Sequence, residues 1–388
     1  MERGPRDPLV ETGVPTSDWE AAFEAVPRHL FLPEVMWPAT EEGHITVSRA
    51  DDPDGWWRWA NADVPIVTQW DDGRHTGSAP GALATSSSSM PTAVLLMFDE
   101  LSVFDGAKVL EIGTGTGWCA ALLSARLGEA NVVSVELDET VADTARKALN
   151  VAGRHPKIVT GDGLLGWPEG APYDRVLVTV GVHEVPRAWI EQTRPGGVIV
   201  MPWGTRYSGQ NAIVRLAVAD DGTAGGRFSR ATRFMHVRSQ RLEWPEFDDY
   251  LPGEGWPADT RRSVTGLSAA QIVDESDYAA SDFAISLLLP DCVRTFARSP
   301  QGLQTMWLFG LTDRSWATVY FDEDDSSQVY QGGPRSLWDE VETAHRWWVE
   351  RGRPGHEEFG LTVTADGRQE VWLGEPSAPV PCVASAVR

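Results

Sequence analysis

Three glycines at alternate positions follow a short apolar stretch that predicts a β-strand. The segment "VLEIGTGTGW" (109–118) places them at Gly113, Gly115 and Gly117, directly before a helical pattern. Because glycine has no Cβ atom, the backbone can turn tightly there and lie close to a ligand. Glu111 stands in the same strand, two positions before the first glycine. This combination is typical of a loop that binds a nucleotide or a nucleoside.

Two further acidic residues follow the next two predicted strands. Glu136 lies near the end of "NVVSVEL" (131–137), and Asp162 stands in "GDG" (161–163). A carboxylate at the end of the second strand can accept hydrogen bonds from both hydroxyls of a ribose. Ligands of open α/β sheets bind beyond the carboxyl ends of the strands, so we expect all three motifs to face one crevice.

The spacing of the glycines separates two classes of cofactor. Dinucleotide-binding turns use G-x-G-x-x-G and hold a pyrophosphate at a helix N-terminus. Here the pattern is E-x-G-x-G-x-G, which resembles the first motif of the S-adenosylmethionine-dependent methyltransferases. In those enzymes the glycines flank a nucleoside that carries an amino acid. A dinucleotide site and a purely structural turn are the alternatives.

Strand-like and helix-like segments alternate through the region that contains these residues. Apolar stretches predict strands at 108–112, 131–137, 157–162, 173–180 and 196–204. Intervening and preceding patterns predict helices at 92–101, 118–128, 138–153 and 185–193, and a hairpin follows at 211–226. This alternation indicates an α/β fold with a Rossmann-like, doubly wound sheet.

The composition changes on both sides of this core. Residues 1–84 are rich in Pro, Gly and Trp; no strong sheet is expected there, and we interpret them as an N-terminal substrate or cap region. The methyltransferase core is expected at 85–240. Residues 241–388 begin with a linker-like segment and combine short β-like runs with one helix, which predicts a C-terminal α+β extension.

Charge and cysteine content exclude several classes of partner. With 33 Lys+Arg, 56 Asp+Glu and a net charge of −23, the chain lacks the basic character that nucleic-acid binding needs. Cys119, Cys292 and Cys382 are far apart, without metal-ligand spacing, and no metal is expected. Neither a signal peptide nor a membrane span is recognisable, so we expect a cytoplasmic protein without a membrane partner.

Tryptophan is unusually frequent, with 18 residues that are densest in "WWRW" (56–59) and "HRWWVE" (345–350). Exposed tryptophans would suggest a surface that binds peptides or other ligands. Packing inside the cores is the simpler interpretation.

Seven motifs occur in the order found in one methyltransferase family. They are "VPRHLFLPE" (26–34), "ADVPIVTQWDDG" (62–73), "SSSSMPTAV" (86–94), "VLEIGTGTGW" (109–118), "GDG" (161–163), "YDRVLV" (173–178) and "RPGGVIVMPWG" (194–204). Together they resemble the protein-L-isoaspartate O-methyltransferases. The first motif and the serine segment before a helix are the parts most specific to that family.

The resemblance implies S-adenosylmethionine as cofactor, S-adenosylhomocysteine as product and a peptide as substrate. It also implies roles for the matched positions. Ser89, two residues before Pro91, matches the active-site serine and is expected to be catalytic and substrate-binding. The expected cofactor-binding residues are Ser86, Ser87, Ser88, Glu111, Gly113, Gly115, Gly117, Glu136, Asp162 and Gly163. Asn211 and His183 are expected near the acceptor.

Simpler interpretations stand beside several of these roles. The serines could form a solvated loop, and Glu136 could merely end a surface strand. Asp162 could cap a turn. His183 could be an ordinary loop residue.

The chain departs from the family in two ways. The family usually has Thr and a β-branched apolar residue before the catalytic serine, where this chain has Ser87 and Ser88. The chain is also far longer than a repair enzyme of the family, which usually ends soon after the hairpin. Its tail at 332–376 resembles an extension of actinobacterial homologues that accompany ribosomally made, post-translationally modified peptides. Those enzymes methylate an Asp, and the ester closes to an aspartimide that can hydrolyse to isoaspartate.

Three functions remain open at this point. The enzyme could methylate an Asp in a constrained biosynthetic peptide, or it could be a housekeeping enzyme that repairs isoaspartyl residues. A peptide-binding module with a vestigial methyltransferase core is the third alternative.

Overall fold

The computed structural model describes residues 17–383 except 252, 254, 274–277, 300–301 and 323–325. The N-terminal stretch in which a signal peptide was sought therefore lies outside the described residues. The chain divides into two compact units, one comprising Met1–Val180, Val185–Met201 and Arg215–Ala224, the other Gly181–Glu184, Pro202–Val214 and Gly225–Arg388. The functional boundaries at residues 84 and 240 stay a prediction.

A parallel sheet forms the centre of the first unit. Its strands follow the order β10-β9-β6-β7-β8, with bounds Thr193–Trp203, Tyr173–Val178, Val109–Ile112, Val132–Glu136 and Lys157–Thr160. All four residues of β6 are buried, as expected for an apolar central strand covered on both faces. Chain order reverses between β6 and β9, so the switch point of the sheet lies beside the glycine turn.

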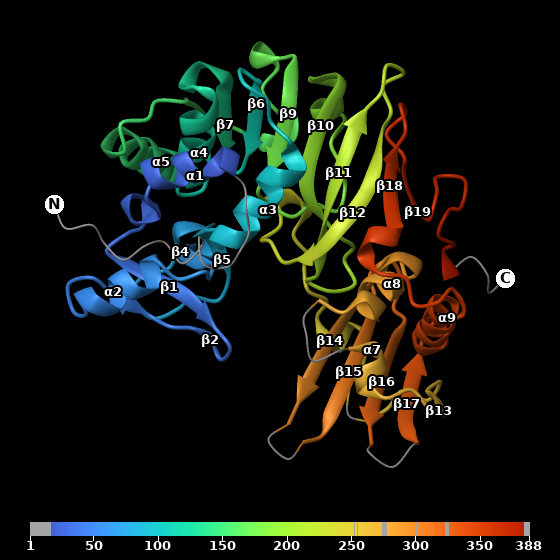
Figure 1. Cartoon of the computed structure of the whole chain (residues 1–388). Helices are drawn as coiled ribbons and strands as arrows, with labels where there is room; N and C mark the ends of the chain where they lie inside the picture. Colours follow the sequence, from blue (N-terminus) through green and yellow to red (C-terminus); the bar gives the residue numbers. More distant parts are fainter. Residues whose placement is uncertain are drawn as a thin grey trace. The chain divides into compact units, whose positions relative to one another are not determined.

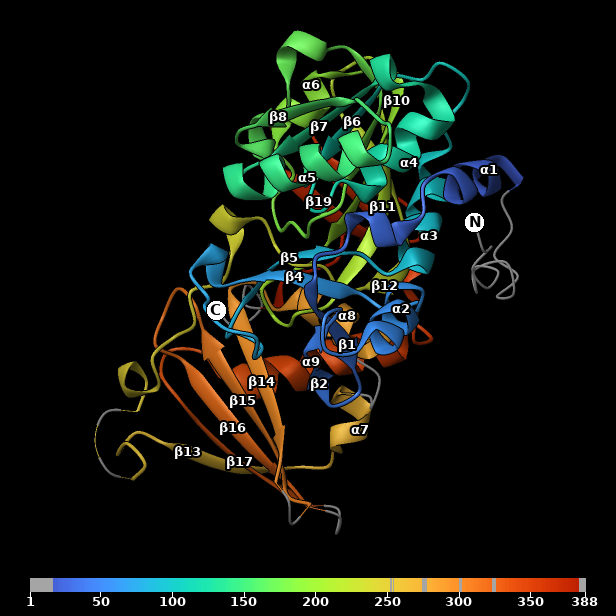
Figure 2. The same ribbon diagram turned by 90° about the vertical axis from the view of Figure 1, so that its left-hand side faces the viewer.

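Four helices accompany this sheet: α3 (Pro91–Leu101), α4 (Trp118–Leu127), α5 (Glu139–Val151) and α6 (Arg187–Glu191). Helix α4 contacts β7, α5 contacts β7 and β8, and the two helices contact each other, so they share one face (Figure 2). The Asp138 carboxylate accepts hydrogen bonds from the amides of Thr140 and Val141 and caps α5. The parallel α/β fold expected from the sequence is confirmed.

The predicted hairpin is formed by β11 (Asn211–Val218) and β12 (Ala224–Thr232). Its turn is closed by a hydrogen bond from the amide of Ala219 to the carbonyl of Thr223. The "DDG" sequence lies within this turn, as its composition predicts.

A second sheet lies in the N-terminal part of the first unit, where no strong sheet is expected from the sequence. Strands β1 (Val35–Thr40), β2 (Gly43–His44), β3 (Val47–Ser48), β4 (Ile66–Trp70) and β5 (Ala84–Ser88) pair antiparallel. Helices α1 (Ser17–Ala25) and α2 (Pro53–Ala60) belong to the same region (Figure 1).

Tryptophan explains why this small sheet is stable despite its short strands. Met36, Trp56 and Ile66 are fully buried in one cluster, and Trp37, Val67 and Trp70 form another. The strands are too short to show a clear alternation in the sequence, which is why the pattern predicts no sheet. The serine segment is largely strand β5 rather than a solvated loop.

The second unit contains an antiparallel sheet in the order β13-β17-β16-β15-β14, with bounds Arg261–Thr265, Ser327–Gly332, Trp316–Phe321, Gln304–Gly310 and Cys292–Arg298. Its helices are α7 (Ala269–Ile272), α8 (Ala280–Leu288) and α9 (Leu337–Glu350), and a hairpin of β18 (Phe359–Val363) and β19 (Gln369–Leu373) follows. One core joins these helices to β15, β16 and β17. The α+β extension is thereby confirmed.

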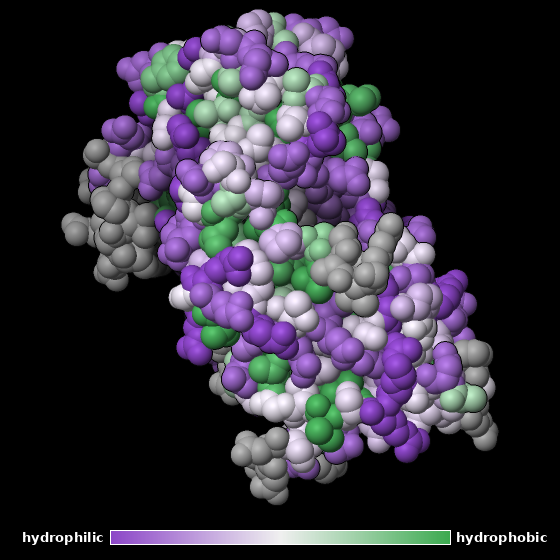
Figure 3. All heavy atoms as spheres, turned by 90° about the vertical axis from the view of Figure 1, so that its right-hand side faces the viewer, coloured by the Kyte–Doolittle hydropathy of each residue, from purple (hydrophilic) through white to green (hydrophobic). Residues whose placement is uncertain are grey.

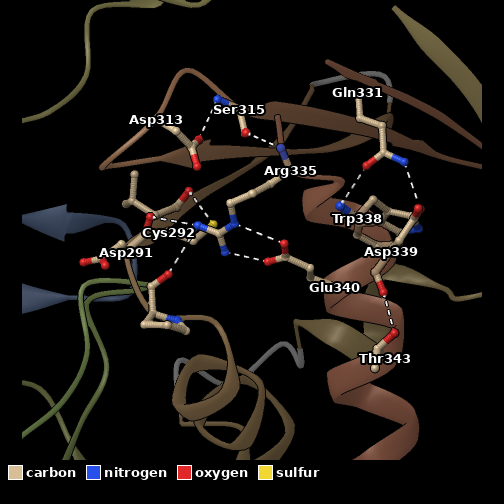
Figure 4. A network of polar contacts seen from close by, with 12 residues as sticks. Asp291, Cys292, Asp313, Ser315, Gln331, Arg335, Trp338, Asp339, Glu340 and Thr343 are labelled. Atoms are coloured by element: carbon tan, nitrogen blue, oxygen red, sulfur yellow. Dashed lines mark hydrogen bonds and ion pairs between the residues drawn. The ribbon is translucent and has the colours of Figure 1, made fainter. Parts of the chain in front are cut away.

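A buried polar network ties α9 to this sheet (Figure 4). The Arg335 guanidinium donates to both carboxylate oxygens of Glu340, at 3.0 and 2.5 Å. Its backbone amide donates to the hydroxyl of Ser315 at 2.8 Å, and Gln331 bonds the start of α9 through Trp338 and Asp339.

Packing, rather than surface display, accounts for most of the tryptophans. Trp56, Trp189, Trp316 and Trp338 are among the largest fully buried side chains, whereas Trp244 is exposed. On the face shown in Figure 3, hydrophilic residues predominate and hydrophobic ones form separate small patches. Within the described ranges, no helix is long and apolar enough to cross a bilayer, and no cluster of metal-ligating side chains is found.

Candidate active site

The turn between β6 and α4 requires glycine at three positions. Gly113, Gly115 and Gly117 have φ values of 93°, 54° and 88°, a region that side chains with a Cβ atom rarely adopt. A Cβ atom at Gly113 would lie 2.9 Å from Cγ1 of Val180, and one at Gly115 would lie 3.2 Å from the carbonyl oxygen of Ser87. The serine segment and the end of β9 therefore both approach this turn closely.

Glu111 is fully buried in β6, and neither of its carboxylate oxygens has a hydrogen-bond partner among the described residues. The pKa of its carboxyl is raised to about 8, mainly by burial; the nearby Ser134 hydroxyl, which itself bonds Thr114 at 2.6 Å, opposes this rise, and the Glu136 carboxylate adds to it. An unpartnered buried carboxylate is costly, so the position favours a ligand that brings a positive charge or hydrogen-bond donors.

Glu136 is held against the glycine turn. Its two carboxylate oxygens accept hydrogen bonds from the amides of Gly115, at 2.9 Å, and Asp138, at 3.0 Å. Each oxygen has two lone pairs, so the carboxylate can accept further hydrogen bonds from a ligand. This geometry ties the predicted ribose-binding residue to the predicted cofactor turn.

Gly163 follows β8 and packs against the last residue of β6, because an added Cβ atom would come within 2.7 Å of Cγ2 of Ile112. The neighbouring Asp162 is exposed, and its side chain accepts a hydrogen bond from the amide of Leu164 at 2.9 Å. This bond caps a short 3₁₀ helix, Gly163–Leu165. The turn-capping interpretation of Asp162 is therefore observed, and its contact with adenine stays a prediction.

The serine segment is fixed by hydrogen bonds from Arg28, a buried arginine for which the sequence predicts no role. The Arg28 guanidinium donates to the hydroxyl and the carbonyl oxygen of Ser88, each at 2.9 Å, and to the carbonyl oxygen of Ser89 at 3.0 Å. It also donates to the carbonyl oxygens of Ala62 and Val64. The motif "VPRHLF" contains Arg28, but nothing in its composition indicates that this arginine is buried.

This arrangement distinguishes the four serines. Ser86 and Ser88 are buried, and their hydroxyls bond Thr68 and Arg28 respectively. Ser87 and Ser89 are half-buried, and the carbonyl of Ser87 faces the glycine turn. A direct side-chain contact to a ligand is therefore better supported for Ser89 than for Ser88.

Asn211 and His183 belong to the second unit. Asn211 is fully buried, whereas His183 is half-buried. Both are connected to His236, a residue that the sequence analysis left without a role; the Asn211 amide lies 3.2 Å from its ring, and the His183 ring stacks on it at 4.3 Å. Asn211 thus holds another side chain, and its predicted contact with substrate stays untested.

A cavity of about 510 Å³ opens elsewhere in the first unit. Its lining includes Lys108, Val132 and Lys157, which lie at the amino ends of strands β6, β7 and β8. The glycine turn follows the carboxyl end of β6, so this cavity is not the predicted cofactor site.

Comparison with known proteins agrees with this geometry. A sequence model of the family "Protein-L-isoaspartate(D-aspartate) O-methyltransferase (PCMT)" matches residues 74–242. The chain is 35% identical over 202 residues to a protein-L-isoaspartate O-methyltransferase of Thermococcus onnurineus, covering 51% of this chain and 76% of the relative. It is 33% identical over 258 residues to protein-L-isoaspartate O-methyltransferase 2 of Pelobacter propionicus, covering 66% and 88%.

The fold is also found among solved structures. A protein-L-isoaspartate O-methyltransferase structure covers 95% of this chain and 98% of its own, with a TM-score of 0.51 and 22% identity. That identity supports a likeness of fold only. From the relatives, the family match and the glycine-and-acid geometry together, we conclude that the chain belongs to the protein-L-isoaspartate O-methyltransferase family of S-adenosylmethionine-dependent carboxyl O-methyltransferases.

Proposed function

We propose that this protein methylates the side-chain carboxylate of an Asp in a modified, constrained ribosomal peptide. The methyl ester then closes to an aspartimide, which can hydrolyse to isoaspartate. The observation that carries methyl transfer is the unpartnered, buried Glu111 directly before the glycine turn. The family supplies the carboxyl chemistry.

The residues around the turn fit S-adenosylmethionine. This cofactor, when bound, supplies a methyl group on a positively charged sulfur that is its own leaving group. Glu111 would balance the positive charge of the methionine portion, and Glu136 would accept the ribose hydroxyls. The glycines leave room for a ligand close to the backbone.

The acceptor needs orientation more than activation. A carboxyl group has an unperturbed pKa of about 4 and is already ionised at neutral pH. Catalysis then consists mainly of aligning the acceptor oxygen with the methyl group and excluding water. The Ser89 hydroxyl can donate to the acceptor carboxylate, and Arg28 fixes the backbone that carries it.

Two features support a constrained peptide as the substrate. Four consecutive serines give the site small side chains where the family usually has bulkier ones. The chain also continues far beyond the family match at residues 74–242 into a second unit with its own core. A modified precursor peptide is the partner that we infer from these features.

A specific observation favours the alternative, repair of isoaspartyl residues. The solved structure named above aligns over 95% of this chain, so a related fold of similar extent exists in a protein named protein-L-isoaspartate O-methyltransferase. The second unit therefore does not by itself identify a biosynthetic role.

Acceptor choice separates the two functions. The enzyme and S-adenosylmethionine would be incubated with a linear isoaspartyl peptide and, separately, with a cyclised Asp peptide, followed by mass spectrometry. A methyl group gained only by the cyclised peptide, followed by loss of methanol, supports the proposal. Efficient methylation of the linear isoaspartyl peptide contradicts it and establishes repair, and methylation of neither peptide contradicts both.

A further inference from the structure

The β4–β5 hairpin of the first unit is irregular just before the serine segment. Its register shifts twice, so that Thr68 is an extra residue on β4 and Thr85 is an extra residue on β5. Gln69 lies between the two shifts, opposite Ser86. Bulges of this kind bend a strand and re-aim a side chain, and they are frequent beside active sites. Gln69 is thus the residue whose side chain the two bulges direct.

The side-chain amide of Gln69 joins this hairpin to the start of α5 (Figure 2). Its Oε1 accepts from the hydroxyl of Thr85 at 2.8 Å, and its Nε2 donates to Oδ2 of Asp138 at 3.3 Å. A carboxylate can only accept and an amide nitrogen can only donate, so the two partners determine the orientation of the Gln69 amide. Oδ1 of Asp138 accepts from two amides of α5. One carboxylate therefore contacts both the helix and the hairpin.

The same hydrogen bonds support a turn in an unfavourable backbone conformation. Asp71, Asp72 and Gly73 all have positive φ values, of 52°, 53° and 78°. Aspartate adopts this region at some cost, and such a conformation persists where neighbouring contacts determine it. Here the amide of Asp72 donates to the Thr85 hydroxyl at 3.2 Å, and that hydroxyl donates to Gln69. A chain of hydrogen bonds therefore runs from the turn, through Thr85 and Gln69, to the start of α5.

Asp138 also belongs to the backbone that shapes the predicted cofactor site. The Glu136 carboxylate accepts from the amides of Asp138, at 3.0 Å, and Gly115, at 2.9 Å. Strand β5 faces Gly115 with a backbone carbonyl and leads directly into Ser89. The hairpin therefore approaches the predicted cofactor site at two places, with its backbone at the glycine turn and with the Gln69 side chain at Asp138.

We propose that Gln69 is a positioning residue that couples cofactor binding to the placement of the serine segment that carries Ser89. A cofactor held by Glu136 fixes the backbone that leads into Asp138, and Gln69 transmits this order to the β4–β5 hairpin. The inference rests on the proposed methyl transfer to a peptide, but not on which peptide is the acceptor. Gln69 acts through Asp138 and Thr85 rather than on a reacting atom.

Hydrogen exchange tests this coupling without any acceptor. Amide exchange of the wild-type protein would be followed with and without S-adenosylhomocysteine. Binding should slow exchange at the glycine turn (113–117) and, by about tenfold, at the turn Asp71–Gly73, the value of one charge-assisted hydrogen bond. In Gln69→Leu, which has a similar volume but no amide, the glycine turn should still respond and the turn Asp71–Gly73 should not. Equal slowing of that turn in the variant, or none in the wild type, would overturn the proposal.

A swapped pair separates coupling from a simple loss of local stability. Gln69→Glu sets a second carboxylate against Asp138 and should also remove the response. Adding Asp138→Asn supplies an amide that can donate to the new carboxylate while its oxygen still caps α5, so the response should return. The matched control adds Glu139→Gln instead, which removes one charge from an exposed neighbour in the same turn and should restore nothing. Recovery by both second substitutions, or by neither, counts against the proposal.

Turnover supplies the kinetic counterpart, with whichever of the two peptides the wild-type enzyme methylates in the acceptor assay. Gln69→Leu should lower kcat about tenfold and raise the KM for the peptide, with little change in the dissociation constant of S-adenosylhomocysteine. A loss confined to cofactor affinity would contradict a positioning role. If the wild-type enzyme methylates neither peptide, the proposed function fails, and the exchange experiment still decides the coupling.

Discussion

Each unit of the molecule contains a buried glutamate, and the two glutamates differ in whether the protein supplies hydrogen-bond partners for the carboxylate. In the second unit, Glu340 is 4% exposed, and both of its oxygens accept hydrogen bonds from Arg335 (Figure 4). In the first unit, Glu111 is completely buried and has no hydrogen-bond partner among the described residues. The first arrangement holds α9 on its sheet, whereas the second leaves a carboxylate available.

The difference shows how to separate structural from functional polar groups. Burying a charge is tolerated when a partner with good geometry compensates for lost hydration. Glu340 meets that condition within the protein itself. Glu111 meets it only when a ligand supplies the partner, so the same residue type marks a fold contact in one unit and a candidate binding site in the other.

The largest effect is expected where the paired glutamate is disrupted. Glu340→Ala leaves the Arg335 guanidinium largely buried without its counter-charge and should lower the free energy of unfolding by about 3 to 5 kcal/mol. Denaturant unfolding monitored in the second unit measures this. The double variant Arg335→Met/Glu340→Leu should recover most of the loss, and a loss as large as that of Glu340→Ala would show that packing, not charge, matters.

Glu111→Gln should leave stability intact and weaken cofactor binding instead. The amide keeps the shape but carries no charge, so the free energy of unfolding at pH 8 should not fall. Affinity for S-adenosylmethionine should fall about 10- to 100-fold, the value of one or two charge-assisted hydrogen bonds. Isothermal titration calorimetry checks the affinity; wild-type affinity in this variant would remove Glu111 from the site.

The pH dependence follows from the same carboxyl. Its pKa is about 8 in the folded protein and near 4.5 in an unfolded chain, so the folded state holds the proton more tightly. This contribution to stability is complete below pH 4.5 and is lost as the pH rises toward 8. Cofactor binding needs the ionised form, so affinity should rise about tenfold per pH unit between pH 6 and 8.

Glu111→Gln is the control for that titration, because an amide does not ionise. Its cofactor affinity should be flat across the same range, and the difference in unfolding free energy between pH 5 and 8 should shrink. An unchanged slope in the variant would assign the pH dependence to another group.

The sequence predicts much of the core and little of what surrounds it. Periodicity located every strand of the parallel sheet, because buried central strands are continuous apolar runs such as "VLEI". It missed the N-terminal sheet, where short strands depend on two clusters built from separate segments, one around Trp56 and the other around Trp37 and Trp70. Local pattern carries no information about such long-range packing.

In the candidate site, too, some residues can be recognised from the sequence and others cannot. The glycines and Glu136 are recognisable because a turn and a strand end have fixed local signatures, and the structure brings them within hydrogen-bond distance. Arg28 and His236 were missed because their roles arise from contacts with residues at distant positions, Ser88 and Asn211. Only the folded chain shows those contacts.

The smallest effects are expected at two neighbouring serines, of which one has a hydrogen-bonded hydroxyl and the other does not. The Ser88 hydroxyl bonds Arg28, whereas the Ser89 hydroxyl has no partner in the described part of the chain. Ser89→Ala should therefore lower kcat about tenfold, the value of one neutral or charge-assisted hydrogen bond, with little change in cofactor affinity or stability. Ser88→Ala should instead lower the free energy of unfolding by about 1 kcal/mol. Turnover and thermal unfolding of the two variants decide the matter, and a Ser89→Ala enzyme with wild-type kcat would show that its free hydroxyl does not orient the acceptor.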